Sequence, residues 1–148
     1  MFTIGIIGCG SIAHTHVSAI QQIPSLKIGM VCDIEEQKAA DFSRRLDCPY
    51  VTDYHGLIAA EGIDAVHICT PHYLHHSMAI DALNAGKHVF CEKPMAIHPS
   101  DAENMIAAAR RNKRTLGICF QNRYNRTSQE AKRLIDSGRI GKVLGGKG

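Results

Sequence analysis

The sequence predicts an α/β fold in which a doubly wound parallel sheet carries helices on both faces. Short, nearly continuous apolar runs, typical of strands buried on both faces, recur along the chain. Segments with a helical spacing of apolar residues separate these runs. Because strands that alternate with helices form β-α-β units, we expect parallel strands joined by helical crossovers.

The first strand is expected over 4–7, where an apolar run ends in glycines. A helical pattern of apolar residues follows as far as Ile20 and ends before Pro24. The run 27–32 predicts the second strand. The segment 35–46 predicts a helix, because acids occupy its first turn and arginines its last, which matches the helix dipole.

Residues 50–51 predict a short third strand, and 54–60 predict a short helix. The fourth strand is expected over 64–69, again an apolar run. A helix then follows over 71–85, because it opens with a proline, which is favoured in a first turn, and Gly86 supplies a C-terminal stop.

The fifth strand is expected over 88–91. Ser100 is expected to cap the next helix, which runs to Asn112, with Glu103 at the capping-box position. The last elements expected are a sixth strand over 115–120, a helix over 127–137 and a seventh strand over 142–144.

The chain has 148 residues, of which 45% are apolar and 21% charged. These values indicate one globular domain and exclude disorder, collagen and coiled coil. No apolar run reaches the roughly 18 residues of a membrane span, and no signal peptide precedes the first strand. We therefore expect a cytoplasmic protein with no membrane partner.

Six cysteines stand at least 16 residues apart, which excludes CxxC motifs. Reduced thiols in a cytosolic protein are the favoured interpretation, and the disulfide framework of a secreted chain is the alternative. His72 and His76 would lie four residues apart on a helix, as zinc ligands can. No glutamate, cysteine or aspartate accompanies them at ligand spacing, so we predict no metal.

Charge is uneven, since residues 1–109 hold 6 basic and 12 acidic side chains and residues 110–148 hold 11 and 2. The basic side chains near the C-terminus are scattered, with Tyr124 as the available aromatic residue. This pattern favours a solvated helix face over a nucleic-acid interface. Arg123 could alternatively attract a phosphate-bearing ligand.

A glycine-rich turn, Gly8-Cys9-Gly10-Ser11-Ile12-Ala13, joins the first strand to the first helix. Gly8 allows a tight turn, Gly10 lets a pyrophosphate approach the backbone, and Ala13 lets the helix pack closely on the sheet. The helix N-terminus, with Ser11 and Ile12 in its first turn, presents free N–H groups to phosphate. This context predicts a Rossmann-type dinucleotide site. A turn that needs glycine only for its conformation is the alternative.

Asp33 follows the second strand, 20 residues after the glycine motif. A carboxylate there can accept hydrogen bonds from the adenosine ribose hydroxyls and repel a 2′-phosphate. No arginine adjoins it to receive such a phosphate, so NAD is favoured over NADP as the cofactor. Asp33 could also cap the helix that follows.

Glu92-Lys93-Pro94 follows the fifth strand, and the carboxyl ends of parallel strands form the ligand crevice of such folds. The Lys93 ammonium can donate a hydrogen bond to a substrate hydroxyl or carbonyl oxygen, or relay a proton. Pro94 can lock the turn, for instance through a cis peptide.

These motifs stand in the order and spacing of one family, together with Thr70-Pro71-His72-Tyr73-Leu74-His75, residues 87–95 and Gln121-Asn122-Arg123-Tyr124-Asn125. The chain resembles the N-terminal half of a Gfo/Idh/MocA oxidoreductase (glucose–fructose oxidoreductase or inositol dehydrogenase). The resemblance implies a nicotinamide-dependent dehydrogenase that oxidises a secondary alcohol of a sugar, cyclitol or related polyol.

The resemblance also implies roles for individual side chains. Those expected to line the nicotinamide side are Thr70, Pro71, His72 and His75. Glu92 and Lys93 would contact the cofactor ribose and the substrate, and Arg123 would lie near the nicotinamide end. Lys93 would polarise the reacting oxygen and is the one catalytic residue predicted. For His75, a packed helix histidine is the alternative.

By the same resemblance, residues 1–120 form the dinucleotide-binding domain, and residues 121–148 form a crossover helix and the start of a second, truncated domain. In the family that second domain shapes the substrate pocket, supplies an Asp and a His for proton transfer, and forms oligomer contacts. We therefore expect this chain to bind cofactor but to turn over poorly, and the full-length protein to be a homo-oligomeric enzyme.

Two other functions fit parts of the pattern. One is a non-catalytic NAD-sensing protein on the same scaffold, since a fold does not fix a function, although a sensor has no need of Lys93. The other is a methyltransferase, which shares a glycine loop and an acid after the second strand. A methyltransferase would not explain Glu92-Lys93-Pro94.

Overall fold

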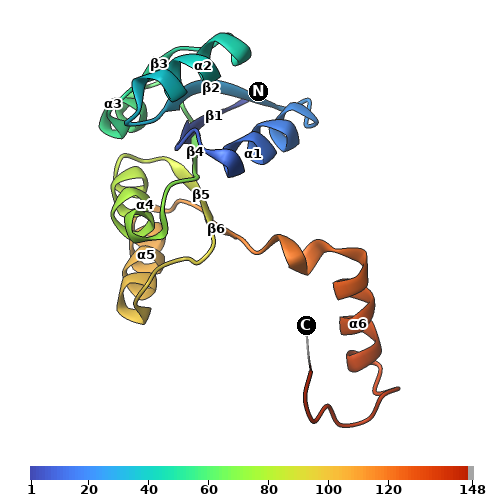
Figure 1. The fold of residues 1–148 in the computed structure, drawn as a ribbon. Coiled ribbons are helices and arrows are strands. Elements are labelled where there is room, and N and C mark those ends of the chain that lie inside the picture. The colour runs from blue at the N-terminus through green and yellow to red at the C-terminus, as the bar shows by residue number, and fades with distance from the viewer. Residues whose placement is uncertain (147–148) are drawn as a thin grey trace.

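The computed structural model describes residues 1–146 and shows a six-stranded, fully parallel sheet in the order β3-β2-β1-β4-β5-β6 (Figure 1). The strands are β1 (Phe2–Ile7), β2 (Leu26–Cys32), β3 (Tyr50–Val51), β4 (Ala65–Ile68), β5 (His88–Glu92) and β6 (Leu116–Cys119). The helices are α1 (Ser11–Gln21), α2 (Glu36–Leu46), α3 (Tyr54–Ala59), α4 (His75–Asn84), α5 (Pro99–Asn112) and α6 (Arg126–Asp136), with single 3-10 turns η1 (His72–Leu74) and η2 (Gln121–Tyr124). The predicted doubly wound fold is confirmed.

Helices cover both faces of the sheet, and each face has its own apolar core (Figure 1). On one face, α1 and α2 bury residues such as Val17 and Phe42 against Ile6. On the other face, α3, α4 and α5 pack against Ile7 and its neighbours. Because neighbouring residues of a strand point to opposite faces, the apolar run of β1 supplies both cores.

Two helices begin differently from the prediction. The residues after Pro71 first form η1, and α4 begins at His75, because the Leu74 N–H donates to the Pro71 carbonyl and closes a tighter turn. Ser100 does not cap α5. That helix begins at Pro99, two residues before the start that a cap at Ser100 would give, because the fixed φ of proline suits a first helical position. Its N-cap is His98, whose side chain makes no capping bond. Gly86 follows α4 with a φ of +78°, which confirms the predicted stop.

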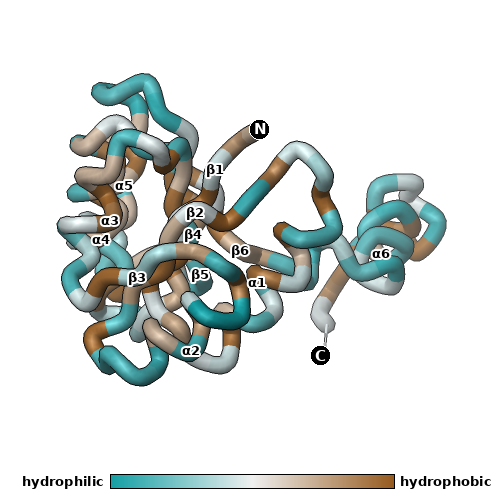
Figure 2. The backbone as a smooth tube through the Cα atoms, turned by 90° about the horizontal axis from the view of Figure 1, so that it is seen from above, coloured by the Kyte–Doolittle hydropathy of each residue, from teal (hydrophilic) through white to brown (hydrophobic). Residues whose placement is uncertain are grey.

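The expected strand over 142–144 does not form. Val143 and Leu144 are exposed, and a strand needs a neighbour that accepts its ladder of hydrogen bonds, which the described part of the chain does not supply there. Helix α6 extends away from the sheet, makes its main contacts with η2, and is mostly polar (Figures 1 and 2). The last two residues of the predicted segment 121–148 lie outside the described residues.

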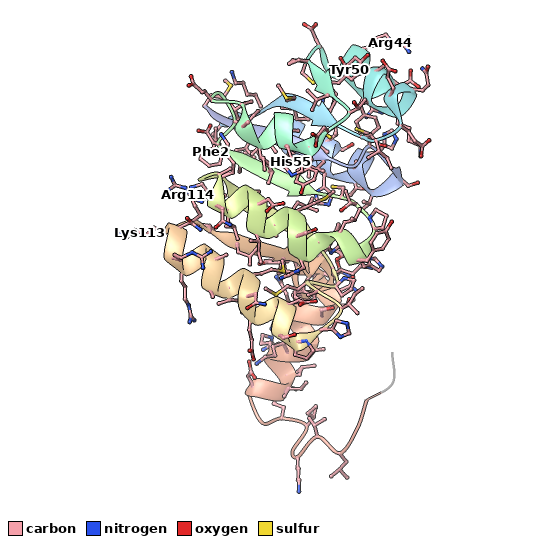
Figure 3. All side chains as sticks on the ribbon, turned by 90° about the vertical axis from the view of Figure 1, so that its left-hand side faces the viewer. Phe2, Arg44, Tyr50, His55, Lys113 and Arg114 are labelled. Carbon is pink, nitrogen blue, oxygen red and sulfur yellow. The ribbon has the colours of Figure 1, made fainter. Side chains whose placement is uncertain are left out.

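The six cysteines are free thiols, five of them buried, as the favoured interpretation predicted. Within residues 1–146, no helix is both long and apolar enough to span a bilayer. Figure 3 labels Phe2, Lys113 and Arg114 together at the edge where the strands begin, so these two basic residues lie at the opposite edge of the sheet from the strand ends described next.

Candidate functional site

A cleft of about 810 Å³ opens at the carboxyl ends of β1, β2 and β4. The strand order reverses between β1 and β4, since β2 and β3 lie on one side of β1 and β5 and β6 lie beyond β4. Ligands of open parallel sheets bind at such a switch point. The lining includes Gly8, Gly10, Asp33, Thr70 and Pro71, so the structure brings together side chains that the sequence separates by up to 63 residues.

The two glycines of the β1–α1 turn serve different purposes. Gly8 has a φ of +93°, and a Cβ there would lie 2.8 Å from the Cys69 carbonyl oxygen, so the fold itself requires glycine. A Cβ on Gly10 would meet nothing within 4 Å, although this residue lines the cleft. The packing of the chain therefore does not require glycine at position 10, and the backbone there is open to a ligand.

Helix α1 presents its N-terminus at the cleft. Gly10 is its N-cap and makes no side-chain capping bond. The Ala13 N–H donates to the Gly10 carbonyl at 3.1 Å, and the Ser11 and Ile12 N–H groups before it are available to an anion. Ser11 and Ile12 are exposed, while Ala13 is fully buried and allows the close helix–sheet contact that the motif predicts. These residues fit the pyrophosphate of a dinucleotide.

Asp33 ties the glycine loop to the end of β2. One carboxylate oxygen accepts from the Cys9 N–H at 2.7 Å and the other from the Glu35 N–H at 2.9 Å. The alternative that Asp33 caps the following helix is wrong, because α2 begins at Glu36 with Glu35 as its N-cap. Each oxygen keeps a second lone pair, so the carboxylate can still accept from a ribose hydroxyl.

Lys38 is a cation in this end of the cleft that sequence reasoning missed. It lines the cleft and forms an exposed ion pair with Glu35 at 2.5 Å. No arginine adjoins Asp33 in the sequence, but helical spacing places Lys38 one turn beyond Glu35 and so brings a cation to this end of the cleft.

On the β4 side, the wall of the cleft consists of Thr70 and Pro71 together with Tyr73, Leu74 and Met78. Met78 also accepts a hydrogen bond from the Thr70 hydroxyl at 3.6 Å. The structure does not place His72 or His75 in this lining. His72 is exposed and His75 is fully buried behind the wall.

The Glu92 and Lys93 side chains occupy different surroundings at the end of β5. Glu92 is buried, and its carboxylate accepts from His16 Nε2 of α1 and from the Lys93 N–H, each at 3.0 Å. The Lys93 side chain is exposed and lines a second hollow of about 480 Å³ with Phe120, Gln121, Asn122 and Arg123. The structure thus brings Lys93 and Arg123 together and places the Glu92 carboxylate against α1. The Lys93–Pro94 bond is cis.

A chain of hydrogen bonds runs from β4 through α1 to Glu92. Burial alone would raise the pKa of Glu92, but hydrogen bonds from His16, the Cys119 thiol and the Lys93 N–H together lower it. Glu92 is therefore ionised, and His16 Nε2 must carry the proton that it donates. His16 Nδ1 lies 2.9 Å from His67 Nδ1, so one of these nitrogens donates to the other. Sequence reasoning missed this contact, because 51 residues separate the two histidines and no local pattern links them.

Within residues 1–146, one group of side chains in this network has ligand atoms close enough together to hold a metal ion. These side chains are His16, Glu92 and Cys119, and the ligand atoms all lie within 4.8 Å of one another. His72 and His76, whose spacing a zinc site would allow but which were not expected to bind metal, do not belong to this group. Burial, followed by the hydrogen bond to Glu92, raises the pKa of Cys119 to about 11, so its thiol keeps its proton and donates it. The arrangement is satisfied as a hydrogen-bonded network.

We expect the free energy of unfolding to fall as the pH is lowered from 6.5 towards 4. Burial and, secondly, the neighbouring His16 lower the pKa of His67 from 6.5 to about 4 in the folded chain. Between these pH values the unfolded chain binds a proton that the folded chain excludes. The contribution of His67 to the free energy of unfolding is therefore fully present above pH 6.5 and declines by about 1.4 kcal/mol per pH unit below it.

Urea unfolding at about pH 7.5 and about pH 5 measures this effect, with an expected difference of roughly 2 kcal/mol. His67→Gln keeps a donor for His16 but does not titrate, so it should remove most of that difference. An undiminished pH dependence in this variant would contradict the assignment.

The fold and this cleft define a class of protein, the dinucleotide-binding domains with a Rossmann fold: a glycine turn at the switch point, a helix N-terminus, and a carboxylate at the next strand end. The model of the Gfo/Idh/MocA oxidoreductases, described as an oxidoreductase family with an NAD-binding Rossmann fold, matches residues 2–120. The chain belongs to this family.

Relatives of known activity and structure support the assignment. The chain is 36% identical over 145 residues to the inositol 2-dehydrogenase of Salmonella typhimurium, covering 95% of this chain and 43% of that protein. The WlbA dehydrogenase from Bordetella pertussis, solved with NADH and UDP-GlcNAcA, superimposes with a TM-score of 0.92 at 31% identity over 96% of this chain and 41% of that one. KijD10, a 3-ketoreductase from Actinomadura kijaniata solved with NADP and TDP-benzene, superimposes with a TM-score of 0.89 at 29% identity. The match covers 96% of this chain and 44% of KijD10. The chain spans about two fifths of the length of these proteins.

Proposed function

We propose that this chain is the NAD-binding part of a dehydrogenase that oxidises a secondary alcohol of a sugar, cyclitol or related polyol. The proposal rests on three features that meet at one edge of the sheet. Gly10 leaves open space above the backbone, Asp33 supplies a carboxylate, and Lys93 lines a second hollow at the same edge. The polyol and sugar-nucleotide relatives support the substrate class.

The cofactor, when bound, supplies the hydride chemistry. The chain's own residues bind and orient. First-turn N–H groups of α1 hold the pyrophosphate, and Asp33 holds the adenosine ribose. On the opposite side of β1, Lys93 would donate a hydrogen bond to the substrate oxygen. It would stabilise the negative charge that develops on that oxygen as the hydroxyl proton passes to a base of the second domain. Arg123, in the same hollow, orients the substrate or cofactor near the nicotinamide end.

The proposal includes a second domain in the whole protein, and it is supported by relatives that are more than twice as long as this chain. Residues 121–148 would lead into that domain, which would complete the substrate pocket and form the contacts of a cytoplasmic homo-oligomer. Hydride transfer requires both reactants in near-attack geometry. The 148 residues should therefore bind NADH, but should show no measurable NAD⁺-dependent oxidation of myo-inositol.

Titration of the chain with NADH, followed by nucleotide fluorescence, tests this function directly. NADPH and S-adenosylmethionine serve as comparisons. Saturable NADH binding with weaker NADPH binding and none of S-adenosylmethionine is expected. Tighter binding of S-adenosylmethionine would favour a methyltransferase, and absence of NADH binding would refute the proposal. In the full-length protein, Lys93→Ala should abolish activity at unchanged NADH affinity, whereas an NAD sensor would have no activity to lose.

Replacing Asp33 with asparagine should shift the preference between the two nicotinamide cofactors. The carboxylate accepts from ribose hydroxyls and repels a 2′-phosphate, and the amide keeps an acceptor for the glycine loop. We expect NADH affinity to fall about tenfold and NADPH affinity to rise, since roughly one hydrogen bond to a charged group is lost. Glu35→Gln is the matched control, because it removes a neighbouring exposed carboxylate that pairs with Lys38. Equal changes in the two variants would show that net charge alone sets the preference.

A further inference from the structure

His75 makes the same kind of contact with both of its ring nitrogens. The side chain is fully buried at the start of α4. Its Nδ1 lies 2.8 Å from the carbonyl oxygen of Pro94, and its Nε2 lies 3.0 Å from the carbonyl oxygen of Thr70. Carbonyl oxygens only accept, so a neutral ring donates to one of them at a time and an imidazolium donates to both.

The two carbonyls belong to the two loops that follow neighbouring strands at the ligand edge. Thr70 and Pro71 follow β4 and line the cleft. Pro94 follows β5, next to Lys93, which lines the second hollow. The ladder between β4 and β5 ends at the pair Ile68 and Cys91. Beyond that pair, the His75 ring connects the two loops.

The position of these loops decides which part of a dinucleotide they would meet. Asp33 marks the adenosine side, at the end of β2. The β4 and β5 loops lie across β1 from it, at the opposite end of the cleft. A dinucleotide that lies across the sheet edge therefore brings its nicotinamide half to the loops that His75 joins.

We propose that His75 is a positioning residue that braces the Thr70–Pro71 loop against the Lys93–Pro94 turn and so fixes the nicotinamide end of the cleft. The inference rests on the proposed function, since it assumes a dinucleotide in the cleft. In this role His75 does not touch the cofactor. It acts through the carbonyl groups of Thr70 and Pro94, which its ring contacts. The brace should affect a full dinucleotide and leave adenosine diphosphate, which ends at the pyrophosphate, unaffected.

The test compares NADH and ADP binding by calorimetry in the wild-type chain, His75→Leu and His75→Gln. His75→Leu removes both contacts at similar volume, and His75→Gln keeps a donor. We expect His75→Leu to weaken NADH about tenfold, the equivalent of roughly one hydrogen bond, with ADP affinity within about twofold of wild type. His75→Gln should lie between them. Leu83→Ala is the matched control, because it destabilises the same helix from a fully buried position in the core.

The outcomes separate the two proposals. A wild-type chain that binds neither nucleotide refutes the proposed function. If the wild type binds both, then parallel losses of NADH and ADP affinity in His75→Leu, or no loss of either, overturn the bracing role. The same selective loss of NADH in Leu83→Ala would attribute it to general destabilisation and also overturn it. Failure of both His75 variants to fold would contradict it too, since a positioning residue leaves the fold intact.

Discussion

Replacing Gly10 with alanine should leave the fold intact and weaken NADH binding at least tenfold, whereas the same change at Gly8 should sharply lower the free energy of unfolding. The new methyl group at Gly10 has open space within 4 Å and an ordinary φ of −82°, so we expect a stability change below about 1 kcal/mol. That space is where the pyrophosphate must approach the backbone.

At Gly8 the reasons are steric and conformational. The φ of +93° strains any side chain, and the Cβ would lie 2.8 and 2.9 Å from the Cys69 carbonyl oxygen and carbon, which belong to the adjacent strand end and cannot easily move. We expect a loss of about 3 kcal/mol or more in the free energy of unfolding.

Urea unfolding and NADH titration of the two variants provide the measurements. The paired design separates a residue required by the fold from one required by the ligand. Unchanged NADH affinity in Gly10→Ala would show that the cofactor does not approach this turn, and a fully stable Gly8→Ala would show that the turn adopts another conformation.

Replacing His16 with leucine should destabilise the chain by about 3 kcal/mol near pH 7, because it leaves the ionised Glu92 carboxylate buried without its histidine partner. The penalty should shrink at lower pH, where the variant's Glu92 can take up a proton. By linkage, a carboxyl whose folded pKa is lowered contributes stability at high pH that is lost as the pH falls through that pKa.

The matched control is the double variant His16→Leu with Glu92→Leu, which replaces the pair by apolar side chains and should recover most of the loss. Urea unfolding of the wild type, of His16→Leu and Glu92→Leu separately, and of the double variant gives the coupling free energy. A single-variant loss below about 1 kcal/mol would show that the contact contributes little.

Addition of EDTA should leave wild-type stability unchanged, since the hydrogen bonds among His16, Glu92 and Cys119 are complete without a metal. A large loss of stability would instead indicate a bound ion.

The candidate site could be predicted from the sequence where local conformation determines it. The turn from Gly8 to Ala13 and the acid at Asp33 follow from strand ends and helix starts that short-range patterns encode, and parallel strands bring their ends to one edge. The position of Lys93 beside that edge follows in the same way. The directions of the Glu92 and His75 side chains could not be predicted, because no local pattern marks either side chain as buried. Only their hydrogen-bond partners on other segments turn them inward.

The sequence by itself determined the alternation of strands and helices, the glycine turn and the residues that follow each strand, since these depend on backbone preferences and on which residues avoid water. Only the tertiary structure decided that 142–144 is no strand and that His67, His16 and Glu92 form one hydrogen-bonded chain. Those features depend on contacts between residues far apart in the chain, and a buried polar group takes whichever partner the packing of separate elements brings within reach.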